Sequence, residues 1–251
     1  MRIKTPPEIE VMREGGRMLA AVLNKLKQEM SAGMNTKELA DMAQAEIKAL
    51  GGRPAFLGHK DFPEALCTSI NHEIVHGLPS KKKILKDGDV IGLDFGVFYK
   101  GLYVDSAITE VVGGRYPNSD VKRLIEGTKE ALSAGIAAIK GGGTRVGDIS
   151  AAVQDVLNRY KLGIIRDLVG HAVGDDIHEE PNIPNYGARG TGPVLPAGVT
   201  IAIEPMASLG DWHIQTGADG WTVEMVDGSL SAHFEHTVVI TDTGAEILTL
   251  L

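Results

Sequence analysis

Two aspartates lie in a pair of β-rich runs that meet at Lys100 and Gly101, in the segment VIGLDFGVFYKGLYVDSAITEVV. This pattern predicts an antiparallel hairpin with a tight turn at those two residues. Residues that face each other across such a hairpin have numbers that sum to 201, so Asp105 faces Gly96. Asp94 lies two residues from Gly96, and both carboxylates therefore project from one face of the sheet.

Two acids so close together in apolar strands repel each other and lose hydration. A cation between them removes that cost, and an oxygen-rich setting suits a divalent metal. Taken alone, the hairpin is also compatible with a solvated sheet face that carries ordinary surface carboxylates.

Three further donors come from the second half of the chain. His171 follows the strand-like stretch IIRDLVGH, Glu204 lies in the apolar run VTIAIEPM, and Glu235 lies in SAHFEHTVVI. A buried glutamate in a strand is rare unless it is paired or bound to metal, although either one alone could form a core salt bridge. Together with Asp94 and Asp105, these residues match two divalent ions, because the ligand charge nearly cancels the metal charge. The sequence therefore predicts a two-metal hydrolytic site.

The elements that must position these donors occur twice along the chain. An amphipathic helix is predicted from Pro6-Pro7 to near Gly33, and a second helix from a capping box at Asn35 and Glu38 to near Gly51-Gly52. Two more helices are predicted near residues 118–140 and 147–161.

A triple glycine, Gly141-Gly142-Gly143, separates the second pair of helices. It lacks the preceding strand and the Gly-Lys-Ser/Thr ending of a phosphate loop, so a helix-breaking turn is the better interpretation. We expect one domain, 1–251, made of two similar halves at about 1–113 and 114–251, with the metals between them.

Several segments of the chain resemble those of type I methionine aminopeptidases, which have the pita-bread metallopeptidase fold. They are CTSINHEIVHGLP, LKDGDVIGLDFGVFYKGLYVDS, VGHAVGDDIHEEP, TIAIEPM and DGWTVEMVDGSLSAHFEHTVVITDTGAEIL, from about residue 67 onward. The resemblance implies an α+β fold with pseudo-twofold halves and an antiparallel sheet covered by helices. It also implies removal of the initiator methionine from nascent proteins, with a small second residue preferred. Prolidase and aminopeptidase P relatives share such ligands, but they would require a separate N-terminal domain.

The same resemblance assigns roles to the five donors. It implies that Asp94 chelates one metal, that Asp105 and Glu235 bridge both, and that His171 and Glu204 complete the other. Glu204 is also the implied proton shuttle, which takes a proton from the attacking water and delivers it to the leaving amine. Oxygen and imidazole ligands admit Fe(II), Mn(II), Co(II) or Zn(II).

Substrate contacts are implied in the same way. His76 and His178 match histidines that contact the substrate around the scissile bond. The HEEP string that follows Ile177 is not a zincin motif, because Asn182 stands where the second histidine would be and Pro181 would break the helix. The resemblance places near the methionine pocket Phe56, His59, Phe62, Cys67, Ile177 and Trp221. Apart from the resemblance, nothing in the sequence indicates a functional role for His59. We expect the remaining histidines to be packed or solvent-facing: His72, His213, His233 and His236.

The pocket departs from the common bacterial pattern. Family members often carry a smaller residue at position 56, tyrosines at 59 and 62, an aromatic residue at 177, and a threonine in place of Gly96. These departures keep two alternatives open: a related aminopeptidase of Xaa-Pro type, and a pita-bread binding module without catalysis.

Composition restricts the remaining possibilities. The chain has 251 residues, 43% of them hydrophobic, which suffices for one sizeable core. Cys67 is the only cysteine, so no intramolecular disulfide forms, and a reducing cytoplasm is expected. The net charge of −8 argues against a DNA-binding protein, and we find no signal peptide or membrane-spanning stretch.

Three weaker expectations concern partners and ions. We expect a monomer that acts on nascent polypeptide N-termini. The basic residues Lys81, Lys82, Lys83 and Lys86 suggest a transient ribosome contact, although a solvated turn is the better interpretation. Asn71 and Ser231 lie at family positions associated with a monovalent cation.

Overall fold

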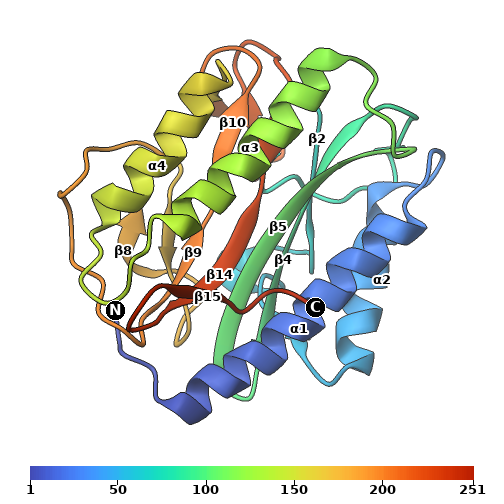
Figure 1. Ribbon diagram of the computed structural model, residues 1–251. Coiled ribbons are helices and arrows are strands. Elements are labelled where there is room, and N and C mark those ends of the chain that lie inside the picture. Colours follow the sequence, from blue (N-terminus) through green and yellow to red (C-terminus); the bar gives the residue numbers. More distant parts are fainter.

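In the computed structural model, which describes all 251 residues, nine strands form one antiparallel sheet (Figure 1). They are β1 (Arg53–Pro54), β2 (Cys67–Ile70), β4 (Val90–Tyr99), β5 (Leu102–Val111), β7 (Gly170–Ala172), β8 (Glu179–Ile183), β9 (Thr200–Ile203), β14 (Glu235–Ile240) and β15 (Ala245–Ile247). The order across the sheet is β1-β4-β5-β14-β9-β7-β8, with β2 paired to β4 and β15 paired to β14. The sheet thus joins strands from both halves of the chain, and β14 lies between β5 and β9.

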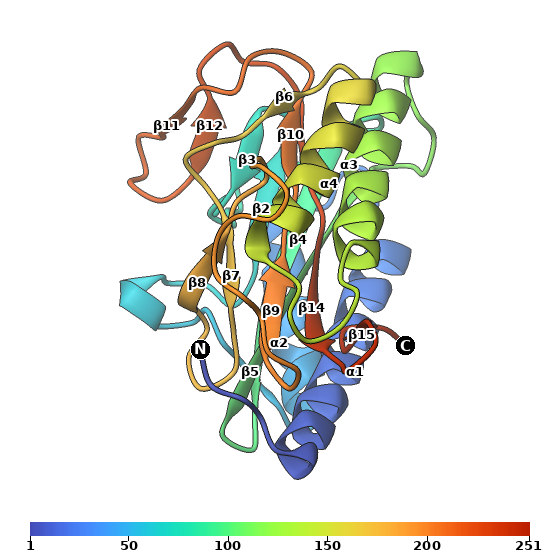
Figure 2. The ribbon, with the colours of Figure 1, turned by 60° about the vertical axis from the view of Figure 1, so that its left-hand side comes forward.

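Four helices cover one face of this sheet (Figures 1 and 2). They are α1 (Pro6–Glu29), α2 (Thr36–Ala49), α3 (Ser119–Ala137) and α4 (Val146–Arg159). One apolar core lies between the α1–α2 pair and β4 and β5, and a second lies between the α3–α4 pair and β9 and β14. No helix combines the length and the apolar composition needed to cross a lipid bilayer.

The predicted helix starts agree with the structure. At the start of α2, the side chain of Asn35 accepts a hydrogen bond from the Glu38 backbone N–H at 3.1 Å, and the Glu38 carboxylate accepts one from the Asn35 backbone N–H at 2.8 Å. This is the predicted capping box. The triple glycine lies in the turn between α3 and α4, as expected.

Two small sheets lie towards the upper end of the molecule in Figure 2, and the first of them contacts α3 and α4. One contains β6 (Gly163–Ile164), β10 (Met206–Ser208) and β13 (Ser231–His233). The other contains β3 (Glu73–Val75), β11 (Ile214–Thr216) and β12 (Val223–Met225). A one-turn 3-10 helix at His59–Asp61 completes the regular elements.

The hairpin register predicted from the sequence is confirmed. Gly96 pairs with Asp105, Asp94 pairs with Ala107, and the turn residues Lys100 and Gly101 have φ angles of 46° and 92°. Positive φ at both central residues is the requirement of a type I′ turn, whose twist matches that of the flanking strands. The turn therefore fixes which face each aspartate occupies.

Candidate metal centre

The strand register brings the predicted donors to one face of the large sheet. Ala107 pairs with Asp94 on one side and with Glu235 on the other, so these two acids lie in one row across three strands. Asp105 lies two residues from Ala107 along β5, and side chains two apart share a face. Three carboxylates thus project together from β4, β5 and β14.

The other two donors reach the same face from the neighbouring strands. Ala202 pairs with Thr237 of β14 and with His171 of β7. Because Thr237 lies two residues from Glu235, His171 projects from the same face of the sheet as the carboxylates. Glu204 follows β9, two residues beyond Ala202. All five residues line a single cavity of about 490 Å³.

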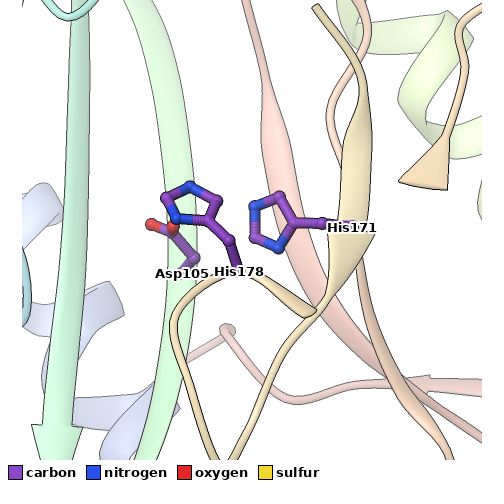
Figure 3. A group of neighbouring side chains, drawn as sticks. All are labelled: Asp105, His171 and His178. Atoms are coloured by element: carbon purple, nitrogen blue, oxygen red, sulfur yellow. The ribbon is translucent and has the colours of Figure 1, made fainter. Parts of the chain in front are cut away.

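The donor atoms approach closely enough to share cations. Asp94, Asp105 and Glu235 form one group whose ligand atoms lie within 4.8 Å of one another, and His171, Glu204 and Glu235 form a second. Glu235 belongs to both. Asp105 and His171 form a third such group with His178, whose ring lies close to both of them in Figure 3.

The carboxylates are buried without a cationic lysine or arginine partner. Asp105 is 3% exposed and Glu235 is 2% exposed, and buried oxygens of Asp94 (Oδ1) and Glu235 (Oε1) accept no hydrogen bond. Burial raises the pKa of Asp105 to about 7, and burial together with the neighbouring carboxylates raises the pKa of Glu235 well above its usual value. The same two causes raise the pKa values of Asp94 and Glu204.

Such a cluster is unfavourable when its members are ionised and alone, because desolvated like charges repel. Divalent cations supply the missing counter-charge and fill the unpaired oxygens. The residues present therefore fit a divalent metal centre with oxygen and imidazole donors.

The imidazole of His171 is prepared for ligation. Its Nδ1 lies 3.1 Å from the carbonyl oxygen of Ala172, which favours a proton on Nδ1 and leaves the Nε2 lone pair free. Burial lowers the pKa of His171 to about 4, so the ring is neutral near pH 7. Its Nε2 lies 3.4 Å from Oε1 of Glu204, inside the cavity.

Both predicted substrate histidines line this cavity. His178 is on the loop between β7 and β8, and its ring centroid lies 4.5 Å from that of His171. His76 follows β3 with a positive φ of 55°, and the next residue, Gly77, packs so closely on β2 that a Cβ atom there would lie 2.2 Å from the carbonyl oxygen of Thr68. The backbone at this point is therefore fixed by close contact.

Five of the six residues predicted for the substrate pocket line the cavity beside the donors: Phe56, His59, Phe62, Cys67 and Trp221. The ring of Trp221 meets the edge of Phe62 with centroids 5.3 Å apart. Ile177 is not among the lining residues. It is fully buried and packs in one cluster with Phe56, behind the cavity wall.

Gly96 explains how a residue as large as Phe56 fits this wall. A Cβ atom at Gly96 would lie 2.8 Å from Cβ of Ala55, 2.8 Å from Cε1 of Phe56 and 3.2 Å from Cδ1 of Ile177. The space that a side chain at position 96 would need is thus filled by these three neighbours. The two departures noted in the sequence compensate each other.

Comparison with known proteins agrees with this arrangement. The profile of metallopeptidase family M24 matches residues 10–242. The chain belongs to metallopeptidase family M24.

Full-length relatives of this M24 chain carry one name. Methionine aminopeptidase 1 of Bacillus subtilis is 44% identical over 98% of both chains, and methionine aminopeptidase of Clostridium acetobutylicum is 42% identical over 99% of this chain and 98% of that one. The crystal structure of methionine aminopeptidase from Thermotoga maritima superposes with a TM-score of 0.97 at 45% identity, covering all of both chains. Prolidase from Pyrococcus furiosus matches with a TM-score of 0.79 at 26% identity, covering 99% of this chain and 65% of that one. The predicted pita-bread fold is confirmed.

Several cavity residues of this M24 chain were missed by the sequence argument, among them Asp167, Glu179, Met206 and His233. His233, on β13, was expected to be packed or solvent-facing. It is packed, at 3% exposed, but its Nε2 has no hydrogen-bond partner and lies 3.6 Å from Oε2 of Glu204 and 3.8 Å from Oε2 of Glu235. The available signal was its spacing of two residues from Glu235, which places both on one face of an extended chain.

Asn71 and Ser231 are neighbours in this M24 chain, as a shared site would require. The Ser231 hydroxyl lies 3.1 Å from the carbonyl oxygen of Asn71 and 3.2 Å from that of Glu73, and can donate its one proton to either. The Asn71 carbonyl also accepts the Ser231 backbone N–H at 2.9 Å. Carbonyl oxygens thus converge beside the serine, outside the carboxylate cluster.

Proposed function

We infer that this M24 chain is a methionine aminopeptidase, a metal-dependent hydrolase that removes the N-terminal methionine from proteins and peptides. The observation that carries this inference is the full-length similarity to methionine aminopeptidases, combined with five metal-compatible donors on one sheet face. An apolar pocket adjoins those donors, which suits an unbranched thioether side chain. A related enzyme of Xaa-Pro type is not favoured, because the identity to prolidase is much lower.

The proposed ligands are the five buried donors. Asp94 would chelate one divalent ion, Asp105 and Glu235 would bridge both ions, and His171 and Glu204 would complete the second. Two bound ions lower the pKa of a water towards neutrality and offset the negative charge that develops on the peptide carbonyl oxygen. The donor set admits Fe(II), Mn(II), Co(II) or Zn(II).

Glu204 is the proposed proton carrier. It accepts a proton from the attacking water at a carboxylate oxygen and then donates it to the leaving amine. Burial and the nearby carboxylates raise its pKa, which favours the protonated form through which the transfer passes. His171 and His233 flank its two oxygens at 3.4 Å and 3.6 Å, and restrict where the carboxylate can point.

His76 and His178 are the proposed contacts to the reacting peptide group. Each can donate a hydrogen bond to the carbonyl oxygen or to the tetrahedral intermediate. Phe56, Phe62 and Trp221 exclude water from the methionine side chain. The proposed activity includes a preference for a small second residue, because a bulky one would clash with the walls beside the donors.

The proposed cellular setting is the cytoplasm, where the enzyme meets the N-termini of nascent chains. We propose that it is a monomer with one domain made of two similar halves. The single cysteine, Cys67, is buried and unpaired, in keeping with a reducing compartment. Lys81, Lys82 and Lys86 are exposed, while Lys83 is paired with Glu73 at 2.5 Å. A transient ribosome contact would therefore use Lys81, Lys82 and Lys86. We also propose that a monovalent cation binds beside Asn71 and Ser231, where its role would be structural.

Peptide cleavage tests the proposed function. Metal-free protein is reconstituted in turn with Mn(II), Fe(II), Co(II) and Zn(II), and offered Met-Ala-Ser, Met-Leu-Ser and Ala-Pro-Ser. We expect metal-dependent release of methionine, faster from the alanine peptide than from the leucine peptide, and no cleavage of Ala-Pro-Ser. The inference is wrong if no metal restores cleavage of either methionine peptide.

A further inference from the structure

The first residues of the chain lie against the loop between β7 and β8 (Figure 2). Arg2 forms two hydrogen bonds to the carboxylate of Asp175, from Nε at 2.7 Å and from Nη2 at 2.6 Å. Nζ of Lys4 lies 3.1 Å from Oδ2 of Asp175 and 3.9 Å from Oε1 of Glu179. This loop also carries His178, which lines the cavity together with Glu179, whereas Lys4 and Asp175 do not.

The contact of Lys4 is not an ordinary surface ion pair. Its side chain is 1% exposed, and lysine is almost never buried to this degree unless it is paired. A Cβ atom at Gly174 would lie 2.3 Å from Cε of Lys4, so the glycine leaves the space that the lysine stem fills. The Lys4 backbone N–H also donates to the carbonyl oxygen of Gly198 at 2.8 Å, which fixes the segment to the body of the protein.

Glu179 extends these contacts across the loop. Its Oε1 accepts the backbone N–H of Asp175 at 2.7 Å and that of Asp176 at 3.1 Å. Lys4 is the one buried cation that contacts both carboxylates: Asp175, which is 47% exposed and also paired with Arg2, and Glu179, which is 14% exposed. Lys4 thus links the two acids on either side of the turn that carries His178.

We propose that Lys4 is a positioning residue for His178. Through Asp175 and Glu179 it fixes the β7–β8 loop so that the His178 imidazole lies beside Asp105 and His171. This rests on the proposed function, in which His178 contacts the scissile peptide. A displacement of about 1 Å in such a group can lower the rate about a hundredfold, so a residue outside the cavity controls the reaction.

The test compares Lys4→Met with a matched control, Lys122→Met, which removes an exposed lysine paired with Glu126 at 3.8 Å on α3. Cleavage of Met-Ala-Ser by the Mn(II)-reconstituted enzyme is measured together with amide hydrogen exchange of residues 170–183 in the metal-free protein. We expect Lys4→Met to speed exchange in the loop and to lower kcat/KM about 10- to 100-fold, mainly through kcat. Lys122→Met should change neither.

A double variant separates positioning from general structure. If Lys4 acts through His178, Lys4→Met has little further effect on activity in a His178→Ala background. An equal loss in both backgrounds, or faster loop exchange with unchanged kcat, overturns the proposal. Asp175→Asn gives the same readouts, with a smaller effect expected, should Lys4→Met fail to fold. A wild type that cleaves no peptide refutes the proposed function, and the exchange data then still decide whether Lys4 holds the loop.

Discussion

Gly96→Ala is expected to destabilise the protein by about 1–3 kcal/mol, the usual range for overpacking a filled core. The new Cβ would lie 2.8 Å from Cβ of Ala55 and from Cε1 of Phe56, whereas carbon atoms prefer about 3.5–4.0 Å. Ala55 cannot withdraw easily, because its N–H donates to the carbonyl oxygen of Gly96 at 2.8 Å. Phe56 must therefore turn, which alters the wall of the substrate cavity.

Gly92→Ala on the same strand is the matched control. A Cβ there would have its nearest neighbours at 3.7 Å, which is ordinary van der Waals contact. This variant should be neutral or slightly stabilising, because alanine restricts the unfolded chain. Comparing the two variants separates the steric effect at position 96 from the general effect of replacing glycine in a strand.

The assay is urea denaturation of the metal-free variants, together with KM for Met-Ala-Ser after reconstitution. We expect a lower midpoint and a higher KM for Gly96→Ala only. In a Phe56→Ala background the penalty of Gly96→Ala should shrink, with a coupling of about 1 kcal/mol between the two sites. The reasoning is refuted if Gly96→Ala matches Gly92→Ala in both midpoint and KM.

Three further outcomes are expected. Glu204→Gln should abolish turnover while circular dichroism and the denaturation midpoint stay close to wild type, and full activity would remove its role as proton carrier. Metal binding at pH 7 should release protons, because burial raises the pKa values of the carboxylates that would hold the metal, that of Asp105 to about 7. Calorimetry in buffers of different ionisation enthalpy measures the number of protons released, and the metal affinity should rise with pH. Zero release would contradict the clustering of buried acids. Gly77→Ala should lower both stability and activity, since its Cβ would overlap the Thr68 carbonyl at 2.2 Å and displace His76; an unchanged melting temperature would count against that contact.

Local rules were sufficient for the hairpin. The turn at Lys100 and Gly101 fixes the register, and the period of two then places Asp94 and Asp105 on one face without any knowledge of the rest of the fold. The burial of Glu235 was also predictable, because apolar neighbours flank it within one strand. These arguments need only residues that are close in the sequence.

Other features depend on contacts between distant segments. From the sequence alone, Lys4 would be expected to be an exposed N-terminal lysine. It is buried because a loop about 170 residues later has a glycine, Gly174, where the lysine stem packs. Ile177 lies behind Phe56 because position 96 is a glycine on another strand. His233 faces Glu204 only through the pairing of β13 with β10. The spacing of residues along the sequence cannot predict contacts that depend on several distant segments at once.

The central place of β14 bears on how the molecule matures during synthesis. This strand joins β5 to β9, yet it is translated after both of them and brings Glu235 with it. A growing chain that ends before residue 235 has two unjoined sheet fragments and an incomplete set of donors. Completion of the proposed metal site is therefore a late event, and a nascent copy that still lacks β14 cannot hold metal with the full donor set.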